Sequence, residues 1–309
     1  MRETGLFRGS GACLLVLGLA GAAAAQTTRL IEIAPGERLR VVEAGHGEPV
    51  LLVPGMFGSA FGYRKLTDQL AEAGYHVVVV EPLGLGGSDK PPRADYSLTA
   101  QAERLAAALE SLQVERAVVV AHAVGASIAF RLALRHPQRV KAIVSLDGGP
   151  TEVAATPGFR RAMRFSFLIR LAGVGRLRGI VKSTLVERSA DPRWVTDEIV
   201  EGYLGEGSHN LSATLAAFGQ IAKAREPEAL QPRLPELRCP VRLVLGTATR
   251  KGGVSEEEIG ILQAGLATFS IDRVPSAGHF VFEEAPQAVV AAVAAVAPLR
   301  HAARTVGGP

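Results

Sequence analysis

The sequence predicts an α/β fold in which a mostly parallel central sheet is flanked by helices and a helical segment is inserted after Asp147. Short apolar runs that suit buried strands recur along the chain, and segments with helical periodicity separate them. This alternation indicates βαβ units, whose parallel strands are covered on both faces. The alternation stops between Pro150 and about Pro235, where the chain has helical character.

Seven apolar runs are predicted to form the strands. Each spans four or five residues and most are rich in valine and leucine, which pack well on a buried sheet. They lie at residues 39–43, 50–53, 76–80, 117–121, 142–146, 241–245 and 270–274.

Three segments between these strands have the clearest helical periodicity. In the segment 98–112, Leu98, Leu105 and Leu109 fall on one face. The other two helices are predicted at 124–135 and 287–296.

The interruption of the alternating pattern is predicted to be a cap inserted between two strands. Glycines and prolines divide it into several helices. We therefore expect an α/β core formed by residues 26–149 and 236–297, a helical cap at 150–235 and a flexible tail at 298–309.

The first 25 residues have the pattern of a signal peptide. Arg2 and Arg8 precede an apolar run at 12–25, and the alanines at its end form a small-residue cleavage site. The run has about 14 residues, whereas a membrane span needs roughly 20. We expect the mature chain to begin at Gln26 and to be exported to the periplasm or the medium. An uncleaved membrane anchor is the alternative.

Composition and charge limit the classes of function. The 309 residues are 48% apolar and 21% charged, which is typical of a globular protein and excludes collagen, coiled coils and disulfide scaffolds. The net charge of +4 is a small excess of bases, so we expect no nucleic-acid partner.

The excess of positive charge is concentrated in the predicted cap. Seven bases and no acid lie between Gly158 and Lys182. Solvated arginine side chains are one explanation, and attraction of an anionic substrate or weak contact with a membrane surface is another. The apolar residues between these bases lie around the whole helix rather than on one stripe, which weakens the membrane interpretation.

Four short patterns occur in order along the chain. VLLVPGMFGS at 50–59 is a strand that runs into a glycine-containing loop. EPLGLGGSDKP at 81–91 has glycines that suit a tight surface turn. AVVVAHAVGAS at 117–127 is a strand that runs into a helix, and VPSAGHFVFEEAP at 274–286 contains a histidine. Together they resemble the α/β-hydrolase superfamily, and the resemblance covers about residues 28–297.

The resemblance implies that the third pattern is a nucleophile elbow. The family has G-x-S-x-G there, with a catalytic serine on a strained strand-to-helix turn. Ala123 occupies the serine position, and alanine has no nucleophile to offer. Two nearby positions that are usually glycine are alanine as well, which favours natural drift over an engineered substitution. The resemblance also implies that the backbone N–H groups of Met56 and Val124 form an oxyanion hole.

The fourth pattern resembles the loop of the family's catalytic histidine, and His279 stands at that position. The catalytic carboxylate of the family usually lies directly after the strand predicted at 241–245. This chain has no carboxylate there. In a minority of members, including some haloalkane dehalogenases, the acid follows the preceding strand, and Asp147 has that place. Asp147 would then orient His279 and stabilise its protonated ring. The alternative is an aspartate that only caps the strand end.

The resemblance leaves three functional hypotheses. The first is an exported protein of ester-hydrolase-like ancestry whose serine-hydrolase activity is lost or altered. The second is an active enzyme in which His279 and Asp147 act as a general-base pair, on water or in cofactor-free chemistry on a small acidic substrate. The third is a non-catalytic protein that binds a small molecule under the cap. None of the three requires a cofactor or a metal ion.

Overall fold

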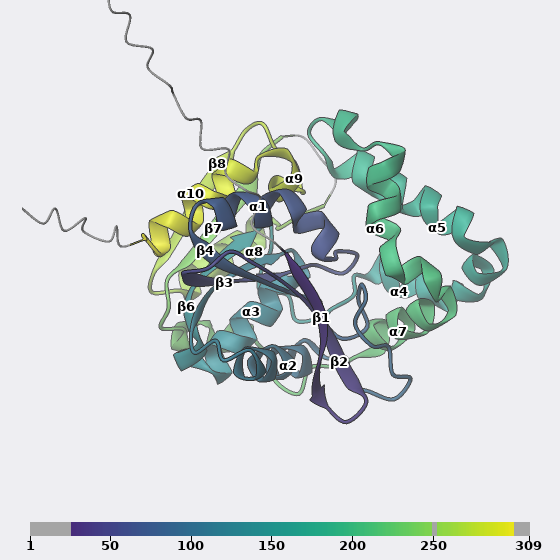
Figure 1. The fold of residues 1–309 in the computed structure, drawn as a ribbon, viewed down its shortest axis with the longest axis horizontal. Coiled ribbons are helices and arrows are strands. Elements are labelled where there is room, and N and C mark those ends of the chain that lie inside the picture. The colour runs from purple at the N-terminus through teal and green to yellow at the C-terminus, as the bar shows by residue number, and fades with distance from the viewer. Residues whose placement is uncertain (1–25, 249–251, 300–309) are drawn as a thin grey trace, which may run out of the picture.

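A computed structural model describes residues 26–248 and 252–299 (Figure 1). Its strands are β1 Thr27–Ala34, β2 Glu37–Ala44, β3 Glu48–Val53, β4 Tyr75–Val80, β5 Ala117–His122, β6 Val140–Leu146, β7 Val241–Gly246 and β8 Phe269–Val274. They form one sheet in the order β1-β2-β4-β3-β5-β6-β7-β8. The pairs β1–β2 and β2–β4 are antiparallel and all others are parallel. The predicted α/β class with a mostly parallel sheet is therefore confirmed.

All seven predicted strands are present, each within two residues of its predicted bounds. Strand β1 was not predicted. It is an edge strand in which Thr27 to Leu30 are exposed and only Ile31 is buried, so it lacks the apolar run that identifies a central strand. By contrast, all six side chains of β5 are buried.

Helices cover both faces of the sheet and bury a separate apolar cluster on each. Leu51 and Leu52 of β3 are adjacent and fully buried, yet they belong to opposite clusters, because successive side chains of a strand point to opposite faces. One cluster includes residues of α2 (Leu98–Ser111) and α3 (Val124–Arg135), and the other includes residues of α1 (Arg64–Glu72) and α10 (Pro286–Val296). The core helices are α1 Arg64–Glu72, α2 Leu98–Ser111, α3 Val124–Arg135, α8 Glu256–Gly265, α9 Val281–Glu284 and α10 Pro286–Val296.

The three helices predicted for the core are observed as α2, α3 and α10. The hydroxyl of Ser97 begins α2 by accepting the backbone N–H of Ala100. Short 3-10 helices also occur, at Ala60–Tyr63, Pro137–Arg139, Pro192–Trp194 and Gln231–Glu236.

Four helices between β6 and β7 lie together at one side of the sheet (Figure 1). They are α4 Pro157–Arg164, α5 Ser166–Arg188, α6 Asp197–His209 and α7 Leu211–Lys223. Two of them are kinked at glycines with positive φ, α5 at Gly173 (φ 73°) and α6 at Gly205 (φ 40°). We refer to this helical layer as the cap.

The basic segment predicted from the sequence runs along α4 and α5. Arg178 pairs with Asp197 and Glu201, and Lys182 pairs with Asp197, so part of its charge is neutralised by α6. The segment also exposes an apolar side chain, since Leu171 of α5 is 80% exposed. The anionic-substrate and membrane-contact interpretations of this segment both stay predictions.

Two predictions fall wholly or mainly outside the described residues. These are the signal peptide at 1–25 and most of the tail at 298–309, of which 298–299 are described. Within 26–248 and 252–299, no helix is long and apolar enough to span a membrane.

The loop that begins at Glu81 is not the surface turn expected from its glycines. Glu81 is fully buried at the end of β4, and Leu83 and Leu85 are buried with it. The Glu81 carboxylate accepts the backbone N–H of Ala60 at 2.7 Å and that of Gly87 at 2.6 Å. Glu81 therefore joins the loop after β3, which borders the candidate site described below, to the loop after β4.

The cap is also joined to the core by a buried carboxylate on α9. The Glu283 side chain is fully buried and receives two hydrogen bonds from Arg64 of α1, at 2.5 and 3.2 Å. Its Oε1 also accepts the hydroxyl of Tyr203 on α6 at 3.1 Å. Burial, followed by the nearby Glu283 charge, raises the pKa of Tyr203 well above its ordinary value, so Tyr203 stays a neutral donor.

The substitution Glu81→Leu should lower the free energy of unfolding by about 3 kcal/mol, because two backbone N–H groups lose their acceptor in a buried loop. Denaturant unfolding measures this change. Glu72→Leu, at an exposed position of α1, is the matched control and should change stability by less than about 0.5 kcal/mol. Equal effects of the two substitutions would contradict the role given to Glu81.

Candidate active site

The turn between β5 and α3 has the backbone of a nucleophile elbow. Ala123 has φ 50° and ψ −121°, a conformation that residues other than glycine rarely adopt. Its N–H donates to the carbonyl of Leu146 at 3.0 Å. A Cβ on Gly125 would lie only 2.8 Å from the carbonyl oxygen of Val53, so glycine lets α3 begin directly against β3.

Asp147 and His279 are in direct contact. Asp147 follows β6, and its Oδ2 lies 2.5 Å from Nδ1 of His279. Both side chains are buried, with relative exposures of 1% and 5%. Because an ionised carboxylate can only accept, Nδ1 of His279 carries a proton, and in the neutral ring the lone pair is then on Nε2. Oδ1 of Asp147 accepts the N–H of Val254 at 3.3 Å, so the aspartate also binds the loop after β7.

The backbone around His279 is held by the cap and by α9. The His279 N–H donates to the carbonyl of Arg188, the last residue of α5, at 2.8 Å. The Glu284 carboxylate accepts the N–H groups of Gly278 at 2.8 Å and of Ala190 at 2.7 Å. These bonds fix the histidine loop against the end of α5.

His122, the residue before Ala123, is a member of the site that the sequence reasoning missed. Its ring centroid lies 4.5 Å from that of His279, and its Nε2 lies 3.1 Å from the His279 carbonyl oxygen. Since a carbonyl cannot donate, Nε2 of His122 carries the proton. Burial, followed by the charge of the neighbouring His279, holds the pKa of His122 well below its usual 6.5. The sequence feature that could have indicated His122 is its place directly before Ala123 in the elbow pattern at 117–127.

These residues surround a cavity of about 340 Å³ beneath the cap. All five residues predicted for the site line it, namely Met56, Ala123, Val124, Asp147 and His279. The cavity therefore brings together segments from the loops after β3, β5, β6 and β8. Lining residues not predicted from the sequence are mostly apolar or come from the cap and include Phe159, Ile180, Thr184, Leu185, Arg188, Tyr203, Glu258 and Phe280.

The two predicted oxyanion donors occupy suitable places. Val124 is the first residue of α3, where backbone N–H groups have no partner within the helix. Met56 follows Gly55, whose carbonyl accepts the N–H of Gly58 at 2.9 Å in a tight turn. The donor role of both groups stays a prediction. Among residues 26–248 and 252–299, no cluster of three or more His, Cys, Asp or Glu side chains suits a metal ion.

The substitution Ala123→Gly should raise the free energy of unfolding by about 1 kcal/mol, because glycine adopts this positive φ without strain. Ala291→Gly makes the same chemical change at an exposed position of the regular helix α10, and should lower stability by about 1 kcal/mol. Chemical denaturation of both variants tests the opposite signs. A loss of stability in both would show that the elbow is not strained.

The stability of the protein should fall as the pH decreases below about 6.5, because His122 takes up a proton in the unfolded chain but not in the folded one. The slope contributed by one such group is at most about 1.4 kcal/mol per pH unit. His122→Gln, measured by denaturant unfolding between pH 5 and 8, should remove this contribution. His209→Gln on the exposed end of α6 is the control and should retain the slope.

Known proteins resemble this chain over much of its length. A family model described as the alpha/beta hydrolase fold matches residues 48–174. The chain is 35% identical over 242 residues to "Putative carbamate hydrolase RutD" from Klebsiella pneumoniae (strain 342). This match covers 75% of this chain and 85% of RutD. It is 31% identical over 218 residues to epoxide hydrolase A from Mycobacterium tuberculosis. This match covers 69% of this chain but only 64% of that protein.

A solved structure gives the same result for the fold. Cfl2 from Burkholderia cenocepacia superposes with a TM-score of 0.71 at 27% identity, covering 87% of this chain and 94% of Cfl2. The family model, the extended match to RutD and the structural match to Cfl2 all identify the same fold family. The chain therefore belongs to the α/β-hydrolase superfamily, and its relatives include hydrolases.

Proposed function

We propose that this protein is a hydrolase-fold enzyme that uses His279 and Asp147 as a general-base pair and forms no covalent intermediate at the elbow. The observation that carries the proposal is the 2.5 Å contact between His279 Nδ1 and Asp147 Oδ2 beside an elbow occupied by Ala123. Loss of the serine removes acyl-enzyme chemistry, which in a serine protease is worth roughly 10⁶-fold in turnover. The base and the cavity are both retained.

The proposed reaction is the attack of water on an electrophilic carbonyl group. Nε2 of His279 takes a proton from the water, and the resulting hydroxide oxygen bonds to the carbonyl carbon. The N–H groups of Met56 and Val124 would bind the oxyanion that develops. When the intermediate collapses, the proton on His279 passes to the leaving group. Asp147 stabilises the protonated ring throughout.

Esters and carbamates are the substrate classes that we propose, because a single base and an oxyanion hole suffice for both. The name of RutD supports the carbamate class. Proton abstraction from a small acidic substrate without a cofactor uses the same base and is the second candidate. Binding without catalysis is the third, and the methyl group of Ala123 at the nucleophile position favours it.

Short acyl 4-nitrophenyl esters and aryl carbamates test the first candidate. The parent protein should hydrolyse them slowly and without a burst, and His279→Ala should lower the rate by about 100-fold or more. Asp147→Asn should also lower the rate, because it removes the charge that stabilises the protonated ring. Ala123→Ser should introduce a burst, with acylation of the new serine visible by mass spectrometry. Activity of the parent that survives His279→Ala would refute the general-base pair.

We also propose that the protein is exported and that its mature chain begins at Gln26. The proposal rests on the basic and apolar pattern of the first 25 residues. N-terminal sequencing of protein recovered from the periplasm or medium of a bacterial host tests the cleavage point.

A further inference from the structure

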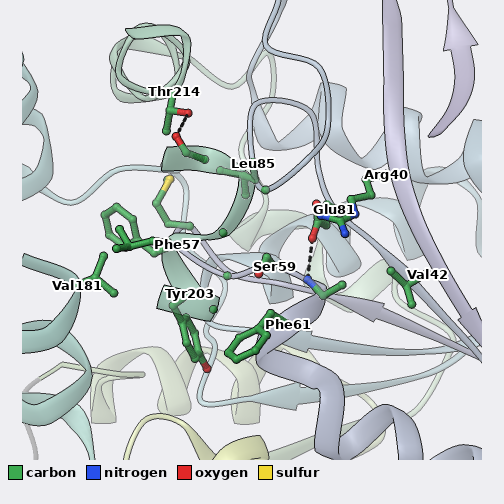
Figure 2. A pocket seen from close by; sticks show the side chains of 18 of the residues that line it. Arg40, Val42, Phe57, Ser59, Phe61, Glu81, Leu85, Val181, Tyr203 and Thr214 are labelled. Atoms are coloured by element: carbon green, nitrogen blue, oxygen red, sulfur yellow. Dashed lines mark hydrogen bonds between the residues drawn. The ribbon is translucent and has the colours of Figure 1, made fainter. Parts of the chain in front are cut away.

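A second cavity of about 450 Å³ adjoins the candidate active site (Figure 2). The two cavities share six lining residues. Three form the loop Met56 to Gly58, which carries a predicted oxyanion donor, and three come from the cap: Leu177, Val181 and Tyr203. The second cavity is therefore continuous with the wall of the first.

The walls of the second cavity are apolar where they approach this shared loop. Phe57, Phe61 and Tyr203 present their rings, and Leu85 and Val181 add aliphatic surface (Figure 2). Glycines at several lining positions leave the space unfilled. An apolar group gains free energy by entering such a space, since it leaves water without the loss of any hydrogen bond.

Phe57 stands at the junction of the two cavities. Its side chain is 45% exposed, although it lines both hollows and is in edge-to-face contact with Phe159 at 5.6 Å and with Phe218 at 5.5 Å. A large aromatic side chain left exposed inside a cleft is a surface for apolar contact. An apolar substrate chain that passes from one cavity into the other would cover the exposed ring of Phe57.

The far end of the second cavity carries two opposite charges. Figure 2 shows the Arg40 guanidinium beside the Glu81 carboxylate, and Glu81 also accepts the Ala60 N–H. Arg64, which also lines this cavity, is bonded to the buried Glu283. Because each of these charges has a neighbour of opposite sign, the cavity wall attracts neither an anion nor a cation strongly. The cavity therefore suits a neutral chain better than a carboxylate or an ammonium group.

We propose that the protein takes extended, neutral substrates whose reacting group lies beside His279 and whose apolar chain passes Phe57 into the second cavity. This substrate class rests on the proposed function, since the reacting group is placed by the general base. The apolar chain of the substrate is bound by Phe57, Phe61, Leu85 and Val181. Binding of the chain does not require the chemistry to occur.

Linear 1-alkanols from hexanol to dodecanol, each kept below its solubility limit, test the proposal. Trp194 is the single tryptophan of the chain, and its ring lies 5.9 Å from that of Phe280 and 6.3 Å from that of Tyr203, so its fluorescence reports on the site. In the parent, the dissociation constant should fall by roughly fourfold for each added methylene along the whole series. Thermal shifts should rise in the same order.

Ser59→Phe fills the second cavity, and Ser59→Ala is the matched control that leaves it open (Figure 2). The phenylalanine variant should bind dodecanol at least tenfold more weakly than the parent and bind hexanol within about twofold of it. The alanine variant should bind the series as the parent does. Thr28→Phe, at an exposed strand position on the rim of the cavity, should act in the same direction if Ser59→Phe fails to fold, and it leaves Trp194 as the single tryptophan.

Two results would overturn the second cavity as a chain site. One is equal dodecanol binding by Ser59→Phe and the parent, which would place the chain elsewhere, such as on the exposed apolar residues of α5. The other is an affinity that does not increase with chain length. Alkanol binding is measured without any turnover, so failure of the proposed catalysis and failure of this inference are separate outcomes.

Discussion

The candidate site depends on one constraint, which is that parallel strands end at the same edge of a sheet. The strands β3, β5, β6, β7 and β8 are joined by parallel ladders, so the loops that follow them meet at their carboxyl ends. Met56, Ala123, Asp147 and His279 each lie in such a loop. This is how Asp147 and His279, 132 residues apart, come into hydrogen-bond contact.

At the elbow the strained backbone conformation is present although the residue that adopts it is an alanine. Ala123 keeps a positive φ that costs about 1 to 3 kcal/mol in a residue other than glycine, and the bond from its N–H to Leu146 helps to hold it there. What this turn still supplies is the position of the Val124 N–H at the start of α3. The chemistry proposed for the site is therefore proton transfer and oxyanion binding, without a covalent step.

The cap and the site are held by the same short segment of chain. His279 donates its backbone N–H to Arg188 of α5, while Glu283 and Glu284 of α9 bind Tyr203 of α6 and the Ala190 N–H. These contacts are charged or backbone hydrogen bonds, so they fix direction as well as distance. The position of the base is thereby tied to the position of the helices that close the cavity.

The sequence by itself determined the α/β class and seven of the eight strands in the described residues, and its resemblance to the family indicated Ala123, Asp147 and His279 as candidate site residues. Those features follow from local periodicity and from the order of the motifs, and both can be seen in the sequence without the fold. Only the tertiary structure decided that Glu81 is buried, that His122 lies against His279 and that a second cavity adjoins the first. Burial, tautomer and cavity shape are set by contacts between segments distant in sequence. No local pattern encodes those contacts, because their energy depends on which side chains the fold brings together.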